Sequence, residues 1–244
     1  MQGRRSVPQN TRKVASMSTL ITINLVNKST QNHNFYFFQE PAKYAGGPNV
    51  YSNGLYSAAL APYDDPTSGG GQLTFRANIQ YIAGIQESDN AVPVVGSSSG
   101  FGTATQPIDL TRADGSPTNN ATNVSISAGG GLGLSVPKFI SGVQAGAFRI
   151  STPGYNANAN NYFAGSAVKL GNGDIVLSNF VLASPSTSLD AQPILKYYVA
   201  VGNFAGGTVM NFTTASSSSA ICDATQGKIS FNVTYDASGN WTTQ

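Results

Sequence analysis

The stretch QNHNFYFFQEP, residues 31–41, decides the fold class, because four aromatic side chains follow one another between polar residues and before a proline. Successive side chains of a β-strand point to opposite faces, so Phe35 and Phe37 are expected on one face, and Tyr36 and Phe38 on the other. Both faces of this strand are then apolar. It is either a core strand of a two-layer fold, or a strand covered by a partner, in which case these four rings form an assembly interface.

The rest of the chain repeats short apolar runs between turn residues. TLITINLVN, residues 19–27, places Ile21, Ile23 and Leu25 on one face, which is typical of a strand. The residues on the other face are Leu20, Thr22, Asn24 and Val26. KLGNGDIV, residues 169–176, predicts a tight hairpin at Asn-Gly. No segment of helix length shows helical spacing of apolar residues. The pattern predicts an all-β protein, an antiparallel β-sandwich that is jelly-roll-like, with about ten strands.

The charge distribution separates the N-terminus from the remainder. Residues 1–16 are expected to form a flexible basic extension, and residues 17–244 a single β-sandwich domain. Four of the 13 Lys and Arg residues lie in the extension, namely Arg4, Arg5, Arg12 and Lys13. The remaining nine face 11 acidic residues, so the domain has no basic stripe of the kind that binds nucleic acid. Nucleic acid is a partner only if the arm itself binds it.

The same N-terminus lacks an apolar run of signal-peptide length. The sequence therefore leaves the compartment open between the cytoplasm and export by a non-classical route. No stretch approaches the roughly 18 to 20 apolar residues of a transmembrane helix.

Catalytic and cofactor chemistry finds little support. His33 is the only histidine, so any histidine-based triad or metal site would depend on it alone, and it is better explained as a residue at the end of a strand. Cys222 is the only cysteine and is expected to be a small buried residue. Carboxylate pairs for glycoside hydrolysis have no local pattern here. We expect a protein that is not an enzyme and needs no cofactor or metal.

Aromatic residues near turns keep a carbohydrate-binding function open, since such rings stack on the faces of sugars. The candidates for stacking are Tyr44, Tyr51, Tyr155 and Trp241. Each of them has packing within the fold as an alternative explanation.

Several segments resemble a loosely defined group of uncharacterised β-rich proteins from fungi and bacteria: ITINLVNKSTQNHNFYFFQEP, GAFRIST, KYYVAVGNFAGGTVMNF and CDATQGKISFNVTYDASGNW. The resemblance spans most of residues 19–241 and implies the β fold. It carries no assigned activity and so implies no functional residues.

Low charge, strands that are apolar on both faces and many small residues favour self-assembly. Charged residues are only 10% of the chain, against roughly 25% in an ordinary soluble domain. We expect a structural protein that forms a filament, lattice or other homomultimer through sheet surfaces and edges. A carbohydrate-binding module is the alternative, and a jelly-roll capsid subunit with an RNA-contacting arm is a third.

Overall fold

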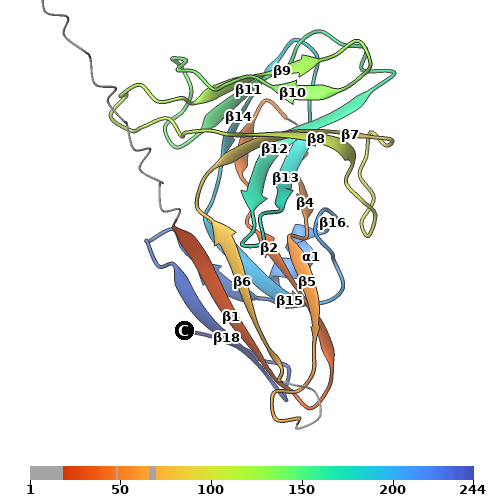
Figure 1. The fold of residues 1–244 in the computed structure, drawn as a ribbon, viewed down its shortest axis with the longest axis vertical. Helices are drawn as coiled ribbons and strands as arrows, with labels where there is room; N and C mark the ends of the chain where they lie inside the picture. Colours follow the sequence, from red (N-terminus) through yellow and green to blue (C-terminus); the bar gives the residue numbers. More distant parts are fainter. Residues whose placement is uncertain (1–18, 48, 66–69) are drawn as a thin grey trace, which may run out of the picture.

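The computed structural model describes residues 19–47, 49–65 and 70–244. Within them it contains 19 strands and one short helix, so the predicted all-β class is confirmed. The strands form four open sheets, which pack as two sandwich-like pairs stacked along the long axis of the molecule (Figure 1). We call these pairs the lower and the upper sandwich, after their places in Figure 1.

The lower sandwich consists of two four-stranded sheets. One has the order β19-β18-β1-β6 and comprises β19 (Trp241–Thr243), β18 (Ser230–Asp236), β1 (Leu20–Lys28) and β6 (Gln72–Asn78). The other has the order β17-β15-β2-β5 and comprises β17 (Ala220–Asp223), β15 (Lys196–Val201), β2 (His33–Gln39) and β5 (Tyr56–Leu60). The lower sandwich thus joins strands from both ends of the described chain.

The upper sandwich consists of a five-stranded and a six-stranded sheet. The first has the order β10-β9-β11-β14-β3 and comprises β10 (Leu132–Leu134), β9 (Ala121–Ile126), β11 (Phe148–Ser151), β14 (Ser188–Gln192) and β3 (Lys43–Ala45). The second has the order β16-β4-β13-β12-β7-β8 and comprises β16 (Val209–Met210), β4 (Tyr51–Asn53), β13 (Ile175–Leu182), β12 (Asn161–Lys169), β7 (Ile82–Ser88) and β8 (Phe101–Pro107).

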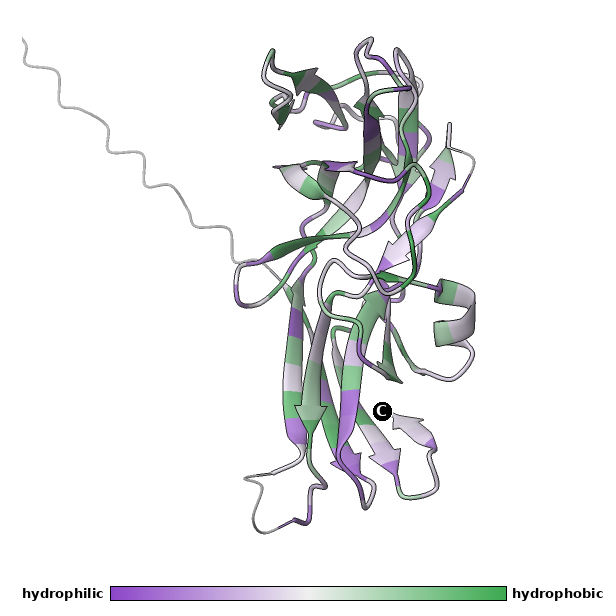
Figure 2. Ribbon diagram, turned by 90° about the vertical axis from the view of Figure 1, so that its right-hand side faces the viewer, coloured by the Kyte–Doolittle hydropathy of each residue, from purple (hydrophilic) through white to green (hydrophobic). Residues whose placement is uncertain are grey.

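The alternation in β1 explains how the lower core is built. The predicted strand is confirmed as β1: Ile21, Ile23 and Leu25 are buried, whereas the residues between them are partly exposed. Ile23 lies opposite Phe75 of β6 and Phe231 of β18, so apolar residues of three strands meet on one face. Figure 2 shows apolar and polar positions alternating along the strands of the lower sandwich. This one-sided burial fixes the register, since a shift by one residue would turn every apolar side chain outward.

The predicted Asn-Gly hairpin is confirmed and has an unexpected place. Asn172 and Gly173 form the turn between β12 and β13, and Gly173 has a φ of 97°, which a glycine adopts without steric cost. Val168 and Leu170 on this hairpin belong to the hydrophobic core of the lower sandwich. The β12–β13 hairpin, whose strands belong to the upper sandwich, therefore packs against the core of the lower sandwich (Figure 1).

Three details differ from the sequence-based expectation. The strand count is higher because long apolar runs are broken at turns and because short polar strands such as β8 carry no apolar signal. Two strand pairs are parallel, β1 with β18 and β9 with β11, in otherwise antiparallel sheets. A short helix, α1 (Phe212–Ser216), follows β16 although no helical spacing predicts it, because Asn211 caps it by accepting a hydrogen bond from the Thr214 amide.

The predicted basic arm, with Arg4, Arg5, Arg12 and Lys13, lies outside the described residues.

Candidate functional site

The four rings of the aromatic stretch are buried within the fold. Phe35 and Phe37 enter the lower core, where Phe37 stacks on Phe75 with ring centroids 4.5 Å apart. Tyr36 and Phe38 enter a second cluster on the opposite face of β2. The sequence allows either a core strand or a strand covered by a partner, and the structure shows a core strand. The expectation that these rings form an assembly interface is therefore corrected, because none of them is accessible on the surface of the chain.

The second cluster explains how both faces of β2 are covered. Phe38 stacks on Tyr198 of β15 and meets Phe212 of α1 edge-on. Tyr36 packs against Phe204, which lies in the loop before β16. The chain supplies this cover itself, through a loop and a short helix far from β2 in sequence. No pattern local to β2 encodes that cover.

His33 lies at the start of β2, as predicted, and its surroundings are aromatic. Its ring packs edge-on against Tyr235 and Phe35, with centroids 5.2 and 6.0 Å away. Among the described residues no three His, Cys, Asp or Glu side chains gather as a metal site would require. Cys222 is buried, as expected, and its burial raises the pKa of the thiol to about 12.

The four aromatic residues considered for sugar stacking do not come together, and each has a packing role. The Tyr44 hydroxyl is buried, lies 2.7 Å from the side-chain oxygen of Asn179 and accepts a hydrogen bond from the Ser166 amide. Burial raises the pKa of Tyr44. The other three residues also pack within the fold: Tyr51 between Phe163 and Phe180, Tyr155 on Tyr162, and Trp241 on Tyr235.

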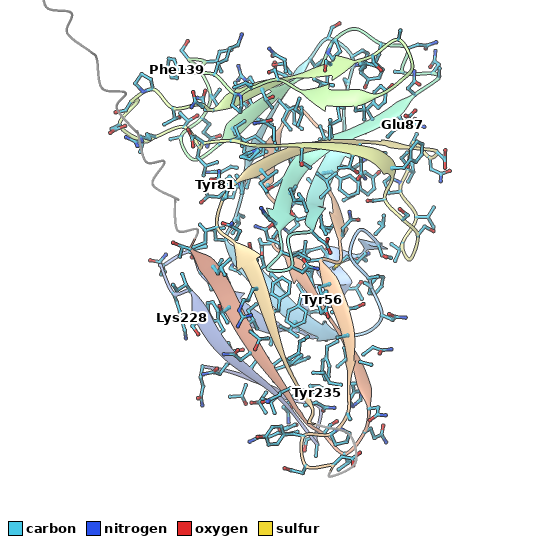
Figure 3. The ribbon with its side chains drawn as sticks, in the orientation of Figure 1. Tyr56, Tyr81, Glu87, Phe139, Lys228 and Tyr235 are labelled. Carbon is cyan, nitrogen blue, oxygen red and sulfur yellow. The ribbon has the colours of Figure 1, made fainter. Side chains whose placement is uncertain are left out.

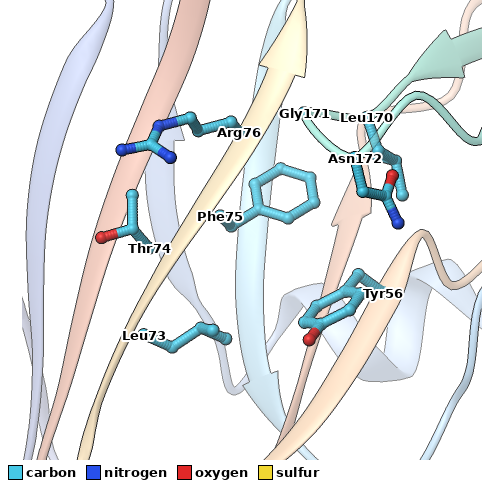
Figure 4. Close-up of a pocket in the computed structure, with 8 residues that line it drawn as sticks. All are labelled: Tyr56, Leu73, Thr74, Phe75, Arg76, Leu170, Gly171 and Asn172. Carbon is cyan, nitrogen blue, oxygen red and sulfur yellow. The ribbon is translucent and has the colours of Figure 1, made fainter.

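A cleft opens instead between β5 and β6, the edge strands of the two lower sheets. Figure 4 shows it, and its volume is about 300 Å³. Phe75 and Leu73 line it from β6, Tyr56 from β5, and Leu170 from the β12–β13 hairpin. The Tyr56 ring is 36% exposed, whereas Phe75 is buried and stacked on Phe37. Thr74, Arg76 and Asn172 line it as well, so the cleft is a partly apolar slot over the lower core.

The two strands that flank the cleft are also unpaired on that side. β5 pairs only with β2, and β6 pairs along its length only with β1, among the strands that the structure describes. One point of the β6 edge is occupied, where the Arg76 carbonyl accepts a hydrogen bond from the Gly171 amide, 2.8 Å away. Alternate residues of a strand direct their backbone groups to the same edge, so those of Thr74 also face the opening. The opposite side of the lower sandwich is closed, since β17 and β19 lie in contact.

A second hollow lies where the two sandwiches meet. Cavities of about 480 and 370 Å³ share Tyr81, which follows β6 at the passage from the lower to the upper sandwich (Figure 3). Asp109 and Arg112 line the first, and Lys43 and Gln192 the second. Burial raises the pKa of the Tyr81 hydroxyl.

Sequence reasoning missed both hollows. Tyr56 and Tyr81 are single tyrosines in ordinary strand patterns, and only the meeting of distant strands makes them lining residues. Comparisons with protein-family models, with curated proteins and with solved structures found no match to this chain. No helix in the described part of the chain combines the length and the apolar character needed to span a membrane.

Proposed function

We propose that this chain is a non-enzymatic structural protein whose copies assemble through the open side of the lower sandwich. The observation that carries the proposal is the pair of unpaired edges, β5 and β6, beside a partly apolar slot. β5 has the sequence YSAAL, pairs with β2 over five consecutive residues, and contains no charge, proline or bulge. Natural proteins usually protect such an edge with one of those features. An unprotected edge is a template on which a second chain can dock.

The low charge of the chain supports the same function. β6 carries a single charged residue, Arg76, and β5 carries none. Charges keep copies of a protein apart, so their scarcity lowers the barrier to close contact between subunits. The proposal includes a jelly-roll-like strand arrangement in the sandwiches, because jelly rolls are common in subunits that assemble.

The test is a charged residue at the open edge. Ala59 is exposed on β5, and Ala59→Lys places an ammonium group at the edge without removing a core side chain. Asn158→Lys is the matched control, because Asn158 is exposed in a turn and the substitution adds the same charge away from the open edge. We expect wild type and Asn158→Lys to exceed the monomer mass of 25.3 kDa in light scattering, and Ala59→Lys to shift toward it. A wild-type protein that stays monomeric at high concentration contradicts the proposal.

The hollow at Tyr81 favours carbohydrate binding as a second candidate. An aromatic ring between polar side chains suits a sugar, which presents an apolar face and a rim of hydroxyl groups. Amide, carboxylate and guanidinium groups at this hollow offer both donors and acceptors. We expect a glycan array to detect binding that Tyr81→Ala abolishes and Tyr63→Ala, at an exposed tyrosine elsewhere, retains. An array with no bound glycan contradicts this second function.

A further inference from the structure

Three valines stand exposed together in the loop between β7 and β8. Val92, Val94 and Val95 are 67, 56 and 54% exposed, with Pro93 between the first two. Apolar residues scattered singly on a surface are ordinary, whereas adjacent ones mark a contact. We call residues 92–95 the valine ridge. No other part of the described chain covers it.

The valine ridge is held in place by the fold. The Gly96 amide donates to the carbonyl of Val209, and the Val209 amide donates back to Ser97, both at 2.9 Å. The Asn53 side chain donates to the Ser99 hydroxyl at 2.8 Å. These bonds fasten the loop to β16 and β4. A surface that is already ordered loses little conformational entropy when it binds, so the ridge is prepared for docking.

The cleft between β5 and β6 has the character that the ridge requires. Thr74, Arg76 and Asn172 line part of it, and Tyr56, Leu73, Phe75 and Leu170 line the rest with apolar and aromatic side chains; its volume is about 300 Å³. A cavity of about 150 Å³ lined by such side chains can hold one benzene molecule. The cleft therefore has room for about two valine side chains. Tyr56, on its wall, would lose its remaining exposure when the cleft is filled.

The net charges around the two surfaces are of opposite sign. Glu87 and Asp89 precede the valine ridge, whereas Arg76 lines the cleft and Lys169 is the neighbour of Leu170 in the chain. None of these four side chains forms an ion pair with another residue in the described ranges. Asp174, in the hairpin turn beside the cleft, accepts a hydrogen bond from Asn172 and keeps its negative charge, so Arg76, Lys169 and Asp174 together leave a net charge of +1 there. Opposite charges at the rim of a contact orient the partners and speed their encounter.

We propose that the valine ridge of one copy docks in the β5–β6 cleft of a second copy. This inference rests on the proposed assembly and names the segment that fills its open side. The two surfaces are distinct on one chain, since the ridge lies in a loop bonded to β16 and β4, whereas the cleft lies between β5 and β6. Glu87, before the ridge, and Tyr56, on the cleft, are both labelled in Figure 3. Each docked copy thus keeps one surface free for the next. Such a head-to-tail contact extends into a filament, or into a ring where the rotation closes.

Disulfide trapping tests the contact directly. Cys222 is buried with a raised thiol pKa, so the reactive thiols are those that are introduced. We expect Val94→Cys mixed with Tyr56→Cys to give a disulfide-linked dimer under mild oxidation, at least about tenfold more than either protein alone. Val94→Cys mixed with Asn158→Cys is the control and should give only the background amount. A chain that carries both Val94→Cys and Tyr56→Cys should give a ladder of multimers or a closed ring.

The outcomes separate this inference from the proposed function. Assembly in light scattering without the Val94–Tyr56 disulfide overturns the docking mode and leaves self-assembly standing. A protein that stays monomeric overturns both. Sedimentation with phosphatidylcholine vesicles forms a second arm of the test. Vesicle binding that Val94→Lys abolishes, together with no trapped dimer, assigns the ridge to a lipid surface and overturns the inference.

Discussion

Phe37→Ala tests whether the aromatic stretch is core or contact. The Phe37 side chain is 0% exposed and packs in the lower core. Truncating a buried phenylalanine to alanine costs about 3 to 5 kcal/mol, because apolar contacts are lost and a cavity remains. The stack on Phe75 contributes about 0.5 to 1.5 kcal/mol beyond simple burial, so part of the expected loss is specific to this ring pair. We expect the free energy of unfolding to fall by about 4 kcal/mol.

The assay is urea unfolding followed by circular dichroism, with a thermal melt beside it. For a chain of this length each kcal/mol moves Tm by about 2 to 4 °C, so the melt should shift by about 8 to 16 °C. Tyr63→Ala is the matched control, because it removes an aromatic ring that is 44% exposed and should change stability by less than about 1 kcal/mol. A Phe37→Ala protein with nearly unchanged stability and a lower assembled mass would show that the ring is a contact, and would refute the core assignment.

Three further predictions concern single side chains. Asn27 is fully buried and its amide donates to three backbone carbonyls, so Asn27→Ala should lower the free energy of unfolding by about 2 to 4 kcal/mol in urea titrations. Cys222 should resist Ellman's reagent in the native protein at mildly alkaline pH and react fully in concentrated guanidinium chloride, because its raised pKa keeps the thiol protonated. Backbone amides of Asn240 and Ser238 lower the pKa of Asp236, so this carboxylate stabilises the turn above its unfolded pKa of about 3.9 and loses that effect as the pH falls through the lower folded value. The fluorescence of Trp241, the only tryptophan, should report this acid step, and Asp236→Ala should remove it.

Local patterns were sufficient where burial is one-sided. The alternation in residues 19–27 predicted the strand β1 and the common face of Ile21, Ile23 and Leu25, because successive side chains of a strand point to opposite faces. The Asn-Gly turn at residues 172–173 was predicted for an equally local reason, the positive φ that glycine adopts. Such features depend on a few consecutive residues, so they are visible in the sequence.

Long-range features were not visible. β8 has a polar sequence and forms a strand because β7 lies beside it. Its sequence therefore contains no alternation of apolar residues from which a strand could be predicted. The parallel pairing of β1 with β18 joins residues about 200 positions apart, which a turn signal cannot indicate. Apolar exposure at Val94 is a tertiary outcome too, since VPVV in a sequence is as compatible with a core as with a surface.

For this protein, the sequence by itself determined an all-β fold, which side chains of its first strands share a face and the absence of a local catalytic motif. The tertiary structure decided that Phe35 to Phe38 are core on both faces, because a loop and a short helix from the C-terminal part cover the second face. It also decided where the fold stays open, between β5 and β6, and where valines stay exposed. The physical reason is that burial depends on what arrives from elsewhere in the chain. The sequence of a strand shows its own periodicity, but it does not show which other segments of the chain will pack against it.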